Sequence, residues 1–159
     1  MNNQSTQNVT KQRRPIELHE WFTYHQATTH LWRITLGPTG QPEFHTLPHQ
    51  VQRCFLTFTT LLIPVIQEHI SIFTDIKFCS CEIPRIELAD IYTQSQAHNL
   101  FERMYQRSIS LPGYKKLSSI EKENETLFYT AIQDLITLYY SPQITLDHCL
   151  EPRPRGEGG

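Results

Sequence analysis

The chain has 159 residues, 38% of them hydrophobic, and a net charge of −2 when its eight histidines are neutral. This length suits a single domain, and the plentiful Leu, Ile and Phe exclude a highly charged disordered chain. The small net charge predicts no bulk electrostatic attraction to nucleic acid or to an anionic membrane.

The N-terminal residues contain no apolar run of the kind that forms a signal peptide. No segment reaches the roughly 18 uninterrupted apolar residues expected of a membrane span. Four cysteines occur in the chain. We therefore predict reduced thiols, a cytoplasmic or nuclear location without secretion, and no membrane partner.

The two ends of the chain differ in composition from the middle. Residues 1–14 are polar and end in a small basic cluster, which predicts a disordered arm. Residues 151–159 form a Pro/Gly-rich tail without apolar residues, which we also expect to be disordered. Residues 15–150 are then one folded domain, and no internal repeat is visible in them.

The first half of the domain is predicted to contain two strands and a helix. Residues 16–24 are aromatic and compatible with a strand, and residues 30–36 alternate between apolar and polar side chains. Residues 48–67 carry an apolar stripe at helical spacing, with Pro64 expected to kink or end that helix. A strand over residues 55–66 is the alternative.

The second half predicts two further strands and two helices. Residues 70–81 and 85–89 alternate as strands, and residues 93–107 have the period of a helix. The clearest helix covers residues 118–140, where Ser118 and Glu121 have the spacing of a capping box.

This order of elements predicts an α+β fold, with a small sheet of about four strands and two or three helices packed on one face. A ferredoxin-like core that starts at His30 is one specific version, although its last strand is missing. We expect the final helix to pack on a sheet face that displays Ile76, Phe78, Ile86 and Leu88.

No catalytic motif is complete, so no catalytic residue is predicted and we expect that the protein is not an enzyme. His19-Glu20 shares two residues with the zinc-protease helix motif, but Thr23 stands where the second histidine belongs. The glycines form no phosphate-binding loop, and no cysteine has the surroundings of an activated nucleophile.

Cys79 and Cys81 are the candidate metal ligands. On a strand they would share one face about 7 Å apart, within reach of one zinc ion. His45, His49 or His148 could complete such a set, whereas two small core side chains are the alternative interpretation. A zinc-stabilised or zinc-dependent protein is therefore one hypothesis, and otherwise no cofactor is predicted.

A basic cluster with interleaved tyrosines is the candidate nucleic-acid site. It contains Arg103, Tyr105, Arg107, Tyr114, Lys115 and Lys116. Two of its arginines lie one helical turn apart, which would let them follow phosphates. Nucleic-acid binding is the second hypothesis, and a solvated helix face is its alternative.

The preferred hypothesis is an accessory protein that acts through protein–protein contacts. Trp21, Phe22 and Tyr24 are close enough in sequence that some must face outward on a strand, and exposed aromatic side chains mark partner sites. A small subunit of a larger complex, or a factor encoded by a virus or a mobile element, is one version of this hypothesis. The oligomeric state does not follow from the sequence.

Overall fold

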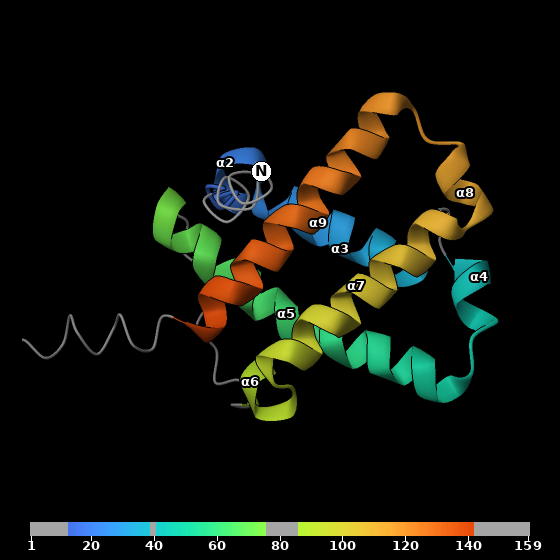
Figure 1. Cartoon of the computed structure of the whole chain (residues 1–159), viewed down its shortest axis with the longest axis horizontal. Helices are drawn as coiled ribbons and strands as arrows, with labels where there is room; N and C mark the ends of the chain where they lie inside the picture. The colour runs from blue at the N-terminus through green and yellow to red at the C-terminus, as the bar shows by residue number, and fades with distance from the viewer. Residues whose placement is uncertain (1–12, 39–40, 76–85, 142–159) are drawn as a thin grey trace, which may run out of the picture.

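The computed structural model describes residues 13–38, 41–75 and 86–141, and these residues form helices without any strand. In chain order the helices are α2 (Leu18–Trp21), α3 (Tyr24–Leu36), α4 (Gln41–His45), α5 (His49–Thr74), α6 (Leu88–Ile91), α7 (Gln94–Ser110), α8 (Pro112–Lys115) and α9 (Ser119–Tyr140). They pack into a bundle in which α3 contacts α5, α7 and α9 (Figure 1).

The predicted α+β fold is wrong, because the segments expected to be strands are helical or connect helices wherever the structure describes them. Residues 16–24 contain the one-turn helix α2, residues 86–89 lead into the one-turn helix α6, and residues 30–36 belong to α3. In α3 the buried Ala27, Leu31 and Ile34 follow one another at intervals of four and three residues, which is the spacing of a helix face. The alternation over residues 30–36 is a fragment of this longer helical pattern.

Of the four residues predicted to form a sheet face against the last helix, the structure describes two, and neither of these lies in a strand. Ile86 is exposed and Leu88 is fully buried at the start of α6, whereas Ile76 and Phe78 lie outside the described residues. The segment predicted as the strand 70–81 is helical as far as Thr74. The predicted tail 151–159 and most of the arm 1–14 also lie outside the described part.

Pro64 does not end α5, which continues for ten residues beyond it to Thr74. The proline removes one backbone donor. Burial of the apolar face of α5 against α2, α3, α6 and α7 offsets this loss. By length and composition alone α5 could also cross a membrane, but a helix that packs into a protein core passes the same test.

The helix predicted for residues 118–140 is confirmed, including its first turn. The Ser118 hydroxyl accepts from the Glu121 amide at 3.1 Å, and the Glu121 carboxylate accepts from the Ser118 amide at 2.8 Å. Two positions on this helix run against the usual rule of apolar residues inside and charged residues outside. Ile120 is exposed, and Glu125 is buried beside His30 of α3.

The described helices form two copies of one four-helix unit, which the sequence analysis did not recognise. Helices α2 and α6 begin at Leu18 and Leu88, and therefore lie 70 positions apart (88 − 18). The same displacement separates the starts of α3 and α7, and those of α5 and α9. The first unit is α2–α5 and the second is α6–α9.

The sequence repeats at the positions that begin helices and fill the core. Ile16-Glu17-Leu18 recurs as Ile86-Glu87-Leu88, and Phe58 recurs as Phe128, both fully buried. Thr23 and Thr93 each cap the next helix and form a capping box with a glutamine three residues later. Most other equivalent positions differ, which hides the repeat from a reading of the sequence.

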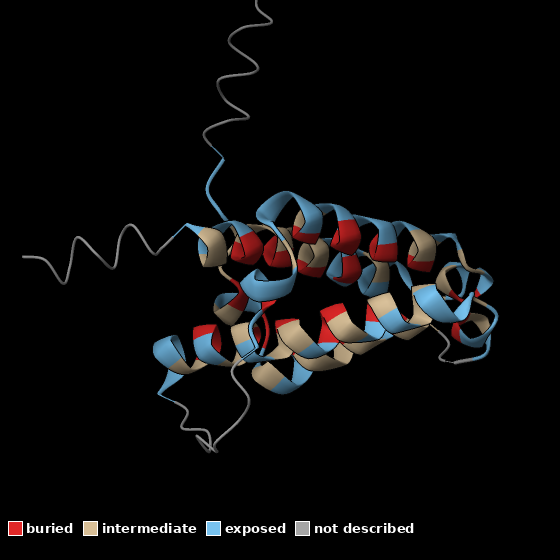
Figure 2. Ribbon diagram, turned by 90° about the horizontal axis from the view of Figure 1, so that it is seen from below, coloured by how far each residue is buried: buried red, intermediate tan, exposed pale blue. Residues whose placement is uncertain are grey.

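The core lies between the two units, and aromatic side chains from both meet there. Phe58 of the first unit lies 6.2 Å from Phe101 of the second, and Phe22 contacts Phe128 edge-on at 5.5 Å. Buried residues therefore face inward on the long helices (Figure 2). The short helices α4 and α8 lie at one end of the molecule, away from α2, α6 and the last turns of α5 and α9 (Figure 1).

Candidate functional site

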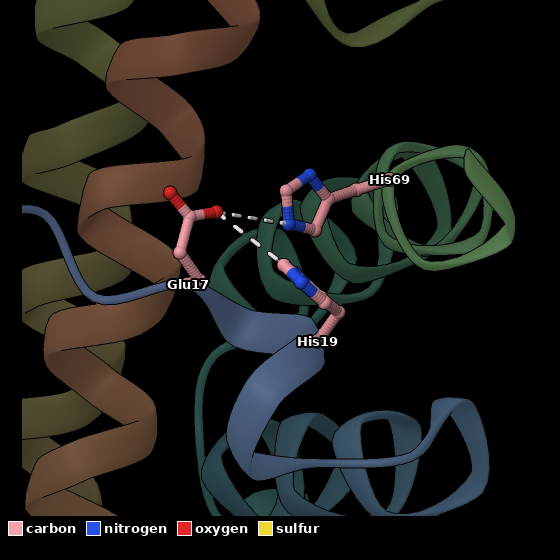
Figure 3. A group of neighbouring side chains, drawn as sticks. All are labelled: Glu17, His19 and His69. Carbon is pink, nitrogen blue, oxygen red and sulfur yellow. Dashed lines mark ion pairs between the residues drawn. The ribbon is translucent and has the colours of Figure 1, made fainter. Parts of the chain in front are cut away.

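Two histidines and a glutamate converge where α2 packs against the last turns of α5 (Figure 3). The Glu17 Oε1 atom lies 3.9 Å from His19 Nδ1 and 4.0 Å from His69 Nε2. All three side chains offer a ligand atom within 4.8 Å of the other two. The set joins the start of α2 to a residue that lies fifty positions later in the chain.

The two imidazole nitrogens that face Glu17 are buried and accept or donate no hydrogen bond within the described parts of the chain. The His69 side chain is only 7% exposed. Its burial, and next the charge of His19, lowers the pKa of His69 to about 4. His69 is therefore neutral near pH 7, and its buried ring nitrogen lacks the partner that such an atom normally finds.

Aromatic packing fixes the orientation of the two imidazole rings. Phe73 stacks on His19 with ring centroids 4.0 Å apart and nearly parallel planes, and its centroid lies 5.0 Å from that of His69. Leu18, which precedes His19, is fully buried and anchors α2 in the core. Glu17 makes no side-chain capping bond to α2, which leaves its carboxylate available to the histidines.

A pocket of about 180 Å³ lies beside this cluster and connects it with solvent. Glu17 and His69 line the pocket together with Ile16, Asp134 and Leu138. Asp134 is already bound, because it accepts from the Ile16 amide at 2.8 Å and from Arg13 at 2.9 Å. The arrangement can coordinate a cation or share a proton between the carboxylate and an imidazole.

The sequence does not reveal this site because His69 lies far along the chain from Glu17 and His19. His19 was noticed only as half of a protease motif that lacks its second histidine. His69 lies in the segment where α5 was expected to have ended, and so had no predicted place.

The three aromatic residues predicted to bind a partner have different environments. Trp21 is 59% exposed at the end of α2, whereas Phe22 is buried in the core. Tyr24 is partly buried and packs against the core from the first turn of α3. Trp21 alone of these three displays a largely free aromatic surface.

The predicted nucleic-acid residues lie in α7 and α8 but do not form one exposed set. Arg103, Lys115 and Lys116 are exposed. Arg107 is half-buried, because it donates to the Thr35 carbonyl at 2.7 Å and covers the ring of Phe55. Burial lowers the pKa of Arg107, although Glu43 partly offsets this effect.

The two tyrosines of that set face the protein. Tyr105 is buried and stacks on Tyr129 at 4.3 Å, so its ring is not available to a base. Tyr114 is partly buried, and the Lys122 ammonium lies 5.4 Å above its ring. The predicted metal ligands Cys79 and Cys81 lie outside the described residues.

Exposed apolar side chains concentrate at the end of the molecule formed by α2, α6 and the last turns of α5 and α9. Six of the eight large hydrophobic residues that are exposed in the described structure lie there. We name this set the apolar end: Trp21, Ile72, Phe73, Ile86, Ile91 and Leu138. Trp21 and Ile91 hold equivalent positions in the two units.

Exposed carboxylates surround the apolar end. They are Glu20, Glu68, Asp75, Glu87 and Asp90. The lysines and arginines of the described chain lie mostly at the opposite end, and Arg13 is one of the two exceptions. Arg13 is paired with Asp134, so among the described residues the exposed carboxylates of the apolar end outnumber its remaining cation, Arg14.

Searches of protein-family models, of curated proteins and of solved structures find no match to this chain.

Proposed function

We propose that this protein is a binding module that recognises another protein through the apolar end. The observation that carries the proposal is the concentration of large exposed apolar side chains at one end of the bundle. Folded proteins expose such residues singly, and a cluster of them marks a contact surface. Trp21 is the natural anchor, since tryptophan is enriched among the residues that dominate binding energy.

The charge around this surface indicates the chemistry of the partner. The carboxylates that surround the apolar end favour a partner segment carrying lysine or arginine beside apolar side chains. Such a segment would bury its apolar groups against Trp21 and Ile91 and place its cations near Glu20 and Asp90. These two carboxylates occupy equivalent positions, so both units would contribute similar contacts.

Photo-crosslinking in the native source tests this proposal. A photoreactive phenylalanine analogue replaces Trp21, Ile91 or, as the control, Ile120, which is 68% exposed in the first turn of α9. We expect the variants at positions 21 and 91 to capture the same protein, through a peptide that contains apolar and basic residues. The variant at position 120 should not capture it.

Purified components then measure the contact. W21E/I91E should weaken binding of the captured partner by at least about tenfold, whereas I120E leaves binding unchanged. An equal loss of partner binding in W21E/I91E and in I120E would overturn the proposal. So would crosslinks that join positions 21 and 91 to a second copy of this chain, because the basic end of that copy would then be the partner.

Nucleic-acid binding has weaker support. Arg103, Lys115 and Lys116 are exposed, but Glu102 and Glu121 lie among them and Tyr105 is buried. Titration with labelled single-stranded RNA at about 50 mM salt tests this alternative. Binding that falls steeply with salt and is lost in K115A/K116A would favour it over the protein contact.

A further inference from the structure

We propose that Glu17, His19 and His69 form a zinc site that the second unit does not possess. This goes beyond the proposed protein contact and does not depend on it. The site would take one divalent zinc ion through His19 Nδ1, His69 Nε2 and a carboxylate oxygen of Glu17. A water molecule from the neighbouring pocket would complete four-coordination.

The repeat supplies a comparison inside the same molecule. The positions equivalent to Glu17, His19 and His69 in the second unit, 70 residues later, hold Glu87, Ala89 and Tyr139. In the second unit, hydrogen bonds join α9 to the start of α6. The Tyr139 hydroxyl donates to Glu87 Oε1 at 3.3 Å and accepts from the Ala89 amide at 3.0 Å.

The first unit keeps the glutamate but replaces this closed arrangement with two histidines. Their ring nitrogens are buried and have no hydrogen-bond partner among the described groups. A buried polar atom without a partner is destabilising, so a packing contact between α2 and α5 alone does not explain both histidines. A metal ion would satisfy both nitrogens and the carboxylate together.

The geometry fits zinc after a small adjustment. Bonds of about 2.0–2.1 Å in a tetrahedral site place ligand atoms about 3.3 Å apart. The Glu17 oxygen is 3.9 and 4.0 Å from the two nitrogens and must close by less than about 1 Å. The two nitrogens lie within 4.8 Å of each other and must close by up to about 1.5 Å. Among the three ligands Glu17 has the most room to move, since its side chain is 42% exposed, whereas Phe73 stacks on His19.

The ligand set selects the class of metal. Two neutral imidazoles and one carboxylate suit zinc and related transition metals, whereas calcium and magnesium prefer oxygen ligands throughout. The pocket beside Glu17 and His69 gives the ion and its water a path from solvent.

The test uses the full chain, purified without a histidine tag and stripped with a chelator. Zinc is titrated by calorimetry, and bound zinc is counted by elemental analysis after dialysis. The matched variant is H19A/H69Y, which gives the first unit the residues of the second and a tyrosine that can bond to Glu17. The second variant is E17Q, which keeps the shape of the side chain but removes its charge.

We expect the wild-type chain to bind one zinc equivalent more than H19A/H69Y binds, with unchanged circular dichroism. E17Q should bind zinc at least about tenfold more weakly, which keeps the proposal testable if the double variant does not fold. C79S/C81S controls for the cysteines and should keep the site. Absence of zinc binding, equal binding in H19A/H69Y, or its loss in C79S/C81S would overturn the proposal.

Discussion

Tyr139 holds in the second unit the position that His69 holds in the first, and its hydroxyl donates a hydrogen bond to Glu87 at 3.3 Å. The equivalent glutamate of the first unit, Glu17, faces two imidazole nitrogens that lack hydrogen bonds within the described structure. One helix contact has therefore diverged between the two units. In the second unit the Tyr139 hydroxyl is hydrogen-bonded to the glutamate, and in the first unit the two imidazole nitrogens could bind a ligand.

The burial of His69 predicts that the metal-free protein loses stability in mild acid. His69 has a folded-state pKa of about 4, below the 6.5 of an unfolded histidine, so the unfolded state binds more protons between these values. The contribution of His69 is fully present above about pH 6.5 and is lost as the pH falls toward 4. Its size is at most about 3 kcal/mol, because solvent screens the partly accessible imidazole.

Urea unfolding in chelator at several pH values measures this loss. Glu17 and His19 of α2 are the titratable groups that face His69 across the contact. H19A/H69Y removes both imidazoles and should unfold with a flatter dependence on pH over this range. An equally steep dependence in that variant would show that other groups cause the acid sensitivity.

Glu125, which is buried, and His30, which is partly buried, form a polar contact between the units, with Glu125 Oε2 3.2 Å from His30 Nδ1. Glu125→Ala should destabilise the protein by about 1–3 kcal/mol, because it removes the carboxylate that satisfies a partly buried imidazole. Glu123→Ala, at an exposed position of the same helix, is the control and should change stability by less than about 0.5 kcal/mol. Equal effects in chemical denaturation would show that the contact contributes nothing.

Phe58 and Phe128 are the equivalent aromatic residues of the two units, and both are fully buried. Each should cost about 3–5 kcal/mol when replaced by alanine, because the surrounding side chains cannot fill the cavity. Similar losses in thermal and urea unfolding are expected if both units share one core. A variant that leaves one unit folded while the other unfolds, seen as two transitions, would contradict a shared core.

Thr23 and Thr93 are equivalent residues that cap α3 and α7, so replacing each of them tests whether the two caps stabilise the protein equally. Both hydroxyls accept a backbone hydrogen bond at 3.1 Å from a glutamine amide three residues later. Thr23→Ala and Thr93→Ala should each lower the free energy of unfolding by about 1 kcal/mol. Thr60→Ala, at an exposed position within α5, is the control and should have a smaller effect.

The sequence predicted the long helices better than the short ones. Residues 118–140 show helical spacing over several turns and a capping box, so both the helix and its first residue could be assigned. Residues 16–24 could not, because α2 is a single turn between extended residues and has no period to detect. Residues 30–36 taken alone alternate between apolar and polar side chains, which favours a strand. The helical spacing becomes visible only when the segment is extended back to Ala27.

The candidate site could be predicted only in part. His19 was visible as a histidine beside a glutamate, but its partner His69 lies on a different helix and comes into contact only through the fold. The repeat relates Glu17 to Glu87 and His69 to Tyr139, since Ile16-Glu17-Leu18 recurs as Ile86-Glu87-Leu88, but it does not by itself pair Glu17 with His69. Replacement of His19 by alanine and of His69 by tyrosine in the second copy obscures the relationship at the site itself.

The most direct test of the open site in the first unit is zinc-edge X-ray absorption of the full chain loaded with one equivalent of zinc. We expect only nitrogen and oxygen neighbours at about 2.0–2.1 Å, with the scattering signature of two imidazole rings from His19 and His69. Sulfur neighbours at about 2.3 Å would place the ion on cysteine thiolates and contradict the assignment to Glu17, His19 and His69.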